Sequence, residues 1–186
     1  AVERRIPAGD QVLRFVCLSC ETVHYQNPKL VVGCVPEDDA GRILICRRAI
    51  EPRHGFWTVP AGFMENGETL QQAAARESKE EALADVEIGS LLSVVHVLHA
   101  DQVHVFFRGR LRSPEIGAGE ESLEVRMVAE HEIPWDDIAF PTILHSLRAF
   151  FEDRRAGRTG MHALDLAKRP RPPHRPEVPG DDPRAN

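Results

Sequence analysis

Short apolar runs that favour strands recur along the first 150 residues, and two longer stretches have helical spacing. Residues 29–35 and 42–47 are apolar runs joined by the polar text EDDAG, which indicates a β-hairpin. Further strands are predicted at residues 91–98, 103–111 and 123–128. From Ile143 to Arg154, apolar residues recur at the spacing of a helix. The pattern predicts an α/β sandwich, with a mixed sheet between helices.

A first helix is predicted from about Leu70 to Ala84. Thr69 and Gln72 have the spacing of a capping box, in which the two side chains satisfy backbone N–H groups at the start of a helix. The text GFWTVPAGF before it predicts a short strand that leads into a tight turn.

Three carboxylates, those of Glu77, Glu80 and Glu81, are crowded on this helix directly after Arg76. At about 3.6 residues per turn they fall within roughly a third of the helix circumference. Like charges at that spacing repel, so the face is either solvated or neutralised by a cation. Oxygen ligands of high charge suit Mg²⁺ or Mn²⁺. An acidic helix face alone is more often a solvated surface. The choice between a solvated face and a metal site therefore depends on the spacing of the residues around it.

That wider spacing resembles the Nudix box, the signature G-x5-E-x7-R-E-U-x-E-E-x-G-U of the Nudix hydrolases, where U is a bulky apolar residue. Six of its seven fixed letters are present, at Gly62, Glu68, Arg76, Glu77, Glu80 and Glu81. Ser78 stands at the first apolar position, Leu83 replaces the closing glycine, and Ala84 is a small version of the last apolar residue. No carboxylate is lost, so the departures bear on how the helix packs and ends.

The resemblance implies a Nudix-type α/β/α sandwich that hydrolyses a diphosphate with the help of two or more divalent ions. Glu77 and Glu81 are expected to hold the first ion, and Glu80 a second ion or a water-bridged shell. The turn at Gly62 is expected to bring backbone oxygens towards the metal.

Other parts of the site are also implied by the resemblance. Arg76 is expected to act mainly by pairing with Glu68. In several relatives the catalytic base is a glutamate from a loop after the box, and the matching text here is GEESLE. Glu121 is the choice for the base and Glu120 is the close alternative, although an exposed acidic loop needs no function.

Candidates for substrate binding are arginines and aromatic residues. Arg47, Arg48 and Arg53 could bind phosphates, which arginine does with two parallel hydrogen bonds. Trp57, Phe106 and Phe107 could stack on an adenine, although aromatic residues in strands are more often part of the core.

The substrate is narrowed by a resemblance to one bacterial branch of the family, carried by HYQNPK, CRRAIEPRHGFWTVPAGFMENGET, GEESLEVR and IPWDDIAFPT. That branch implies nucleoside diphosphate derivatives such as ADP-ribose, NADH and FAD, cleaved to a nucleoside monophosphate and a second phosphorylated product. The SQPWPFP string of NADH pyrophosphatases is absent, and Ala100 stands where many ADP-ribose hydrolases have a proline. A nonenzymatic nucleotide sensor and an RNA cap pyrophosphohydrolase stay open as alternatives.

The amino-terminal segment resembles the zinc ribbon that precedes this branch. Cys17 and Cys20 form one CxxC, and a tetrahedral zinc site needs two such pairs, which leaves zinc doubtful. His24 is a possible third ligand, and a Cys17–Cys20 disulfide is another alternative. A β-hairpin of residues 2–6 against 12–17 is expected.

Three regions are expected: the resemblance implies a ribbon remnant at residues 1–28 and the hydrolase domain at residues 29–153, and composition predicts that residues 154–186 are a disordered tail rich in proline and arginine. The net charge of −6 divides into +4 for the tail and −10 for the rest. An acidic body makes nucleic acid an unexpected partner. The absence of a long apolar run or a secretory signal predicts a cytoplasmic protein without membrane attachment. A homodimer is expected because ribbon-bearing relatives tend to form one.

Overall fold

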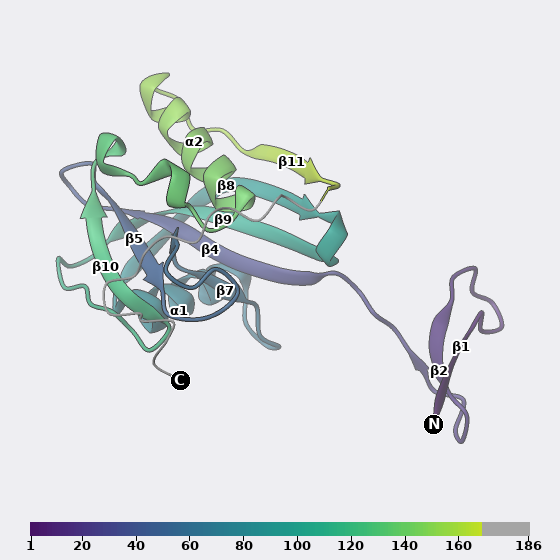
Figure 1. Cartoon of the computed structure of the whole chain (residues 1–186). Helices are drawn as coiled ribbons and strands as arrows, with labels where there is room; N and C mark the ends of the chain where they lie inside the picture. The colour runs from purple at the N-terminus through teal and green to yellow at the C-terminus, as the bar shows by residue number, and fades with distance from the viewer. Residues whose placement is uncertain (169–186) are drawn as a thin grey trace.

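The computed structural model describes residues 1–168. A small three-stranded antiparallel sheet at the amino terminus lies apart from the main body in Figure 1. It consists of β1 (Val2–Arg5), β2 (Arg14–Cys17) and β3 (Val23–His24). The predicted hairpin is therefore present, with a slightly shorter span than expected.

The main body is built on an eight-stranded mixed sheet with the order β10-β5-β4-β9-β8-β11, in which β6 pairs with β5 and β7 pairs with β4. The strands are β4 (Lys29–Glu37), β5 (Ile43–Arg48), β6 (Trp57–Thr58), β7 (Ala61–Phe63), β8 (Val86–Val97), β9 (Gln102–Leu111), β10 (Ser122–Val128) and β11 (His162–Leu166). The helices are α1 (Leu70–Ala82), α2 (Pro141–Arg155) and the 3-10 turns η1 (Leu98–Ala100), η2 (Glu130–Glu132) and η3 (Trp135–Asp137). Pairing is parallel between β4 and β9 and between β8 and β11, which makes the sheet mixed.

Two separate apolar clusters lie on the two faces of this sheet. One contains Ala73 and Ala74 of α1 together with Val32 and Cys34 of β4. The other contains residues of α2, among them Leu147 and Phe151, with Val35 of β4 and Phe106 of β9. Because each helix covers its own face, the molecule is the α/β/α sandwich that the sequence predicted (Figure 1).

The sheet opens between β4 and β5. Their register has a single residue pair, Glu37 with Ile43, after which the two strands separate. The short strand β7 pairs with β4 inside the gap, and β6 pairs with β5. The turn between β6 and β7 therefore lies in the middle of the sheet, beside the helix that carries the glutamates.

Helix α1 has the predicted capping box between Thr69 and Gln72. It ends at Ala82, two residues earlier than expected, because Leu83 adopts a left-handed conformation with φ 51°. Ser78, the polar residue at an apolar box position, is fully buried, donates to the Ala74 carbonyl at 2.8 Å and contacts the Cys34 thiol at 3.2 Å. These contacts satisfy its hydroxyl inside the core.

The predicted tail of residues 154–186 was partly wrong. Residues 162–166 form β11, which extends the sheet by pairing with β8, and α2 continues to Arg155. The rest of the proline-rich text, residues 169–186, lies outside the described residues. Within the described part of the chain, no helix has the length and apolarity needed to cross a membrane.

Candidate active site

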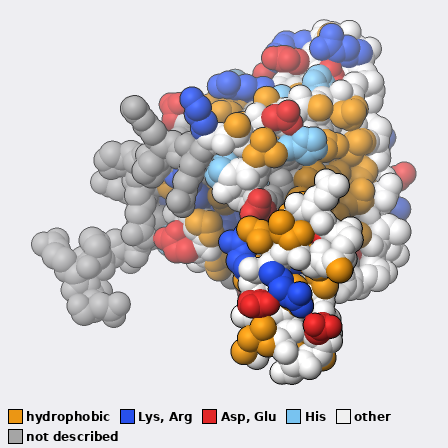
Figure 2. Space-filling model, turned by 90° about the vertical axis from the view of Figure 1, so that its right-hand side faces the viewer, with side chains coloured by type: hydrophobic (Ala, Val, Ile, Leu, Met, Phe, Trp, Pro, Cys, Tyr) orange, Lys and Arg blue, Asp and Glu red, His pale blue; other side chains and the backbone are white. Residues whose placement is uncertain are grey.

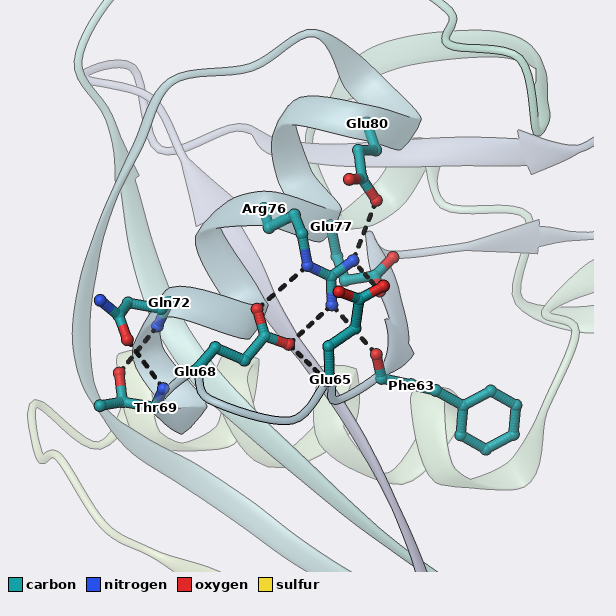
Figure 3. Close-up of polar contacts among 8 residues, drawn as sticks. All are labelled: Phe63, Glu65, Glu68, Thr69, Gln72, Arg76, Glu77 and Glu80. Carbon is teal, nitrogen blue, oxygen red and sulfur yellow. Dashed lines mark hydrogen bonds and ion pairs between the residues drawn. The ribbon is translucent and has the colours of Figure 1, made fainter.

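Arg76 is the centre of a hydrogen-bonded cluster at the middle of α1 (Figure 3). Its Nε and Nη2 donate to the two oxygens of Glu68 at 3.1 and 2.8 Å, a bidentate pair, and Nη2 also donates to the Phe63 carbonyl at 3.0 Å. Its Nη1 donates to Glu77 at 2.8 Å and to Glu80 at 2.9 Å. The structure thus contains the predicted Arg76–Glu68 pair, which ties α1 to the loop that follows β7.

Gly62 is required for the close approach of Glu77. A Cβ atom on this glycine would lie 2.4 Å from Oε1 of Glu77, well inside van der Waals contact. The neighbouring Ala61 N–H donates to Oε2 of Glu81 at 3.3 Å. The bare backbone of β7 therefore lets two carboxylates of α1 reach the opening between β4 and β5.

Burial gives the box carboxylates unequal acidities. Glu77 and Glu81 are 7% and 6% exposed, whereas the Glu80 side chain is 58% exposed. Burial, together with the charge of Glu77, raises the pKa of Glu81 to about 8. Burial also raises the pKa of Glu77, with Arg76 opposing the shift. Arg76, helped by the Glu65 N–H, lowers the pKa of Glu68 to about 2.

The donor set fits a hard divalent cation. Burial raises the pKa values of two of its carboxylates, and a bound cation would favour their ionised forms. Among residues 1–168, no three acidic, histidine or cysteine side chains already converge as a ligand set. Glu77 and Glu80 each accept from Arg76 through one oxygen, which leaves the other oxygen of each carboxylate outside that contact.

A second acidic segment is held against the end of α1 by Gly119. The Gly119 N–H donates to the Glu81 carbonyl at 3.1 Å, and a Cβ atom at this position would lie 1.7 Å from the Glu80 carbonyl oxygen. The next two residues, Glu120 and Glu121, line the same cavity as the box glutamates. The loop after the box therefore contacts the end of the box helix directly, as the base assignment requires.

These groups open into one cavity of about 1100 Å³. One end is charged and is lined by the glutamates of α1, the loop pair Glu120 and Glu121, and Arg48 and Arg76. The remaining wall is mostly apolar or uncharged, with Val31, Phe63, Val97, His99, Gln102, His104, Phe106, Thr142 and Leu166, and the lining also includes the charged residues Glu51, Glu65 and Lys168.

The predicted substrate-binding residues divide between cavity and core. Arg48 and Phe106 line the cavity. Trp57 is 7% exposed and packs in the α2-side core, with the guanidinium of Arg47 6.0 Å from its ring centroid. Arg53 lies over the Phe56 ring. The structure thus places Arg47, Arg53 and Trp57 in packing contacts away from the residues that line the cavity.

Apart from Phe106, sequence reasoning missed the uncharged wall of the cavity. His104 is a half-buried residue of this wall: its Nδ1 lies 3.1 Å from the Thr142 hydroxyl and its Nε2 lies 2.8 Å from Oε1 of Gln102. Burial lowers the pKa of His104 to about 4, so the ring is neutral at physiological pH. Residues 104 and 106 lie on the same face of the strand predicted at residues 103–111, which was the available signal, but only the contact of His104 with Thr142 of α2 shows that this face lines the cavity.

The amino-terminal cysteines are both free thiols. Cys17 is half-buried, and the exposed Cys20 lies 3.1 Å from the Thr22 hydroxyl. His24 on β3 pairs across the sheet with Phe15. The zinc and disulfide alternatives for this segment stay predictions, and the buried thiols of Cys34 and Cys46 belong to the core.

A mixed sheet between two helices, with glutamates of one helix beside a glycine turn in the open centre of the sheet, defines a Nudix hydrolase fold. The family model of the NUDIX domain matches residues 27–150, and a model described as Nudix N-terminal, a zinc-ribbon family, matches residues 1–26. The chain belongs to the Nudix family, and it is a Nudix hydrolase.

Individual relatives agree on the family and differ in substrate. A NUDIX hydrolase structure from Nitrosomonas europaea is 50% identical, with a TM-score of 0.84 over 88% of this chain and 93% of that one. An ADP-ribose pyrophosphatase of Methanocaldococcus jannaschii is 30% identical over 114 residues, 59% of this chain and 67% of that protein. An NAD-capped RNA hydrolase, NudC, of Vibrio atlanticus is 46% identical over 74 residues, but the match spans 38% of this chain and 25% of that protein.

Proposed function

We propose that this Nudix hydrolase cleaves the pyrophosphate bond of a nucleoside diphosphate derivative of the ADP-ribose, NADH or FAD class. The observation that carries the proposal is the continuity of the cavity, which joins the buried glutamates to a long uncharged wall. Charge at one end suits a metal-bound pyrophosphate, and the uncharged wall suits the sugar and base attached to it. The products would be a nucleoside monophosphate and a second phosphorylated compound.

The box glutamates would hold the cations. Glu77 and Glu81 suit a first Mg²⁺ or Mn²⁺ ion because both are buried at the opening of the sheet, and the exposed Glu80 suits a second ion. The ions would neutralise the pyrophosphate and lower the pKa of the attacking water. Arg76, paired with Glu68, keeps α1 and the β7 loop in register, so its role is to position the ligands.

Glu121 is the proposed general base. Its charge contributes to the raised pKa values of both Glu77 and Glu81, which places it within electrostatic reach of the two buried ligands. Its carbonyl accepts from the Ala49 N–H at 2.8 Å, which anchors the residue beside β5. Glu120 lines the cavity but is not among the causes of either shift, so it is the second choice.

A substrate panel tests the proposal. The protein is incubated with Mg²⁺ or Mn²⁺ and ADP-ribose, NADH, FAD, a nucleoside triphosphate or NAD-capped RNA, and products are separated by chromatography. We expect release of a nucleoside monophosphate from the first class, lost in Glu81→Gln and kept in Glu87→Gln, which changes an exposed glutamate of β8. Absence of turnover with tight ADP-ribose binding would instead support a nonenzymatic sensor.

NAD-capped RNA is the second candidate substrate, because the matched segment of the Vibrio atlanticus NudC is 46% identical to this chain. The acidic body of residues 1–153 weighs against it, since RNA binding draws on basic surfaces. Preferential turnover of the capped RNA over NADH would favour this candidate.

The expected homodimer, cytoplasmic location and zinc site stay predictions. Light scattering of the full chain measures whether it forms a homodimer. Elemental analysis of the wild type beside Cys17→Ser measures whether zinc is bound.

A further inference from the structure

The strand β11 lies beyond residue 150, where the match to the NUDIX domain model ends. It pairs in parallel with β8, with Leu166 opposite Val97, and so it forms one border of the sheet next to the cavity. Leu166 and Lys168 are both among the residues that line the cavity. A segment outside the matched domain therefore contributes to the wall of the active site.

A buried carboxylate fixes this segment to the body. Asp153 of α2 has no exposed surface and accepts hydrogen bonds from Arg108 of β9 at 2.5 Å and from Arg158 at 2.9 Å. It also accepts from the Gly160 N–H at 3.0 Å and lies 2.9 Å from Nε2 of His162, the first residue of β11. These contacts, led by that of His162, lower the pKa of Asp153, so the carboxylate stays ionised and the start of β11 is anchored.

The border at β11 is far from the glutamates. Strand β7, which carries Gly62, is followed across the sheet by β4, β9, β8 and β11. Four strand spacings amount to about 19 Å. A pyrophosphate is much shorter than this span, so a ligand whose pyrophosphate lies at the glutamates reaches β11 only through the groups attached to it.

The cavity wall contains three basic side chains, those of Arg48, Arg76 and Lys168, and they differ in their contacts with carboxylates. Arg76 is paired with three glutamates, and Arg48 donates to the Pro52 carbonyl and lies near Glu81 and Glu121. Within residues 1–168, no carboxylate forms an ion pair with Lys168. Figure 2 shows a face of the molecule on which histidine side chains lie next to hydrophobic ones. In the cavity wall, Nδ1 of His99 lies 3.3 Å from the Leu166 carbonyl oxygen.

We propose that β11 and Lys168 form a distal subsite that selects extended nucleoside diphosphate derivatives, with Leu166 packing on the far sugar or base and Lys168 binding its electronegative atoms. The proposal rests on the function proposed above. It assigns a substrate-binding role to a strand outside the matched NUDIX domain, and it predicts that affinity for the substrate depends on what lies beyond the pyrophosphate.

Steady-state kinetics of the full chain separate the distal subsite from the charged end. For Leu166→Ser and Lys168→Ala we expect the KM for ADP-ribose to rise about fivefold or more, with kcat changed less than about twofold. Inorganic pyrophosphate, used as a competitive inhibitor, occupies the charged end alone, so its inhibition constant should stay within about twofold. Lys168→Arg should restore most of the affinity, and Arg110→Ala, an exposed arginine of β9 outside the cavity wall, is the matched control.

An unchanged KM in both variants would overturn the proposal. Equal changes in KM and in the inhibition constant of pyrophosphate would also overturn it, because they would indicate damage to the whole site. If the wild type turns over no substrate, the proposed function fails, and calorimetry of ADP-ribose binding to wild type and Lys168→Ala then decides the distal subsite by itself.

Discussion

The two ends of the cavity differ in how their residues come together. Most of the charged end is local, although Arg48, Glu120 and Glu121 also line it: Gly62, Glu68 and the glutamates of α1 fall within twenty residues, and Arg76 ties them to a single loop and helix. The distal end is assembled from β9, the start of α2 and β11, which are widely separated along the chain. A local site is visible as a spacing in the sequence, whereas a site built by strand pairing is visible only in the fold.

The ends also differ in electrostatics. Burial, with the charges of neighbouring glutamates, raises the pKa values of Glu77 and Glu81 at the charged end, and a bound cation would favour their ionised forms. The distal end, within the described residues, holds a neutral His104 and a single lysine. The chemistry of the reaction is therefore expected to depend on the first end and the choice of substrate on the second, and the following experiments test that division.

The largest expected effect separates the two loop glutamates at the charged end. Glu121→Gln should lower kcat about 10²- to 10⁴-fold, the range for loss of a general base, with little change in KM. Glu120→Gln is the matched control and should change kcat less than about tenfold. Kinetics across a range of pH measure the kcat of both variants. A larger loss of kcat in Glu120→Gln than in Glu121→Gln would identify Glu120 as the general base.

A smaller effect is expected where the acidic loop meets α1. In Gly119→Ala the new Cβ would clash with the Glu80 carbonyl, so the loop must shift and carry Glu121 with it. Misplacement by about 1 Å can cost about 100-fold, and we expect kcat to fall between about ten- and 100-fold. Gly89→Ala, where the new Cβ would lie 3.2 Å from the Arg108 carbonyl oxygen and outside the cavity wall, is the control. Full activity of Gly119→Ala would contradict direct packing of this loop.

The raised pKa of Glu81 predicts a pH-dependent response to metal. Between its ordinary value of 4.5 and about 8, the folded protein keeps a proton that the unfolded chain releases, so the metal-free protein loses stability as pH rises through this window. A divalent ion binds the ionised form and offsets the loss. The gain in Tm on adding Mg²⁺ should therefore be larger at about pH 8.5 than at about pH 6.

Glu81→Gln serves as the control for this experiment. It removes the titrating group, so both the fall in metal-free stability and the pH dependence of the Mg²⁺ effect should shrink. An equal Mg²⁺ effect at the two pH values in the wild type would show that Glu81 is not the group that binds the ion.

The sequence predicted most of the sandwich because capping and alternation are local properties, and the Arg76–Glu68 contact was expected from the resemblance to the Nudix box. It did not predict β11, because His162 to Leu166 have weak strand character and are ordered by pairing with β8 and by the anchor at Asp153. Nor did the sequence show that Arg48 lines the cavity whereas Arg47 does not. These neighbours point to different sides of a strand, and the cavity lies on only one of them.

The smallest expected effect concerns the end of the box helix, where Leu83 stands in place of the glycine of the Nudix signature. A left-handed conformation costs a leucine about 1 kcal/mol or somewhat more, and glycine adopts it freely. Part of the gain in Leu83→Gly would be lost with the packing of the Leu83 side chain near Gly117, where an added Cβ would lie 3.1 Å from Cδ1 of Leu83. We expect a net stabilisation of up to about 1 kcal/mol and a rise of a few degrees in Tm, with kcat and KM unchanged. A loss of stability would mean that this half-exposed leucine holds the acidic loop against α1. In that case Gly119→Ala should also lower the Tm.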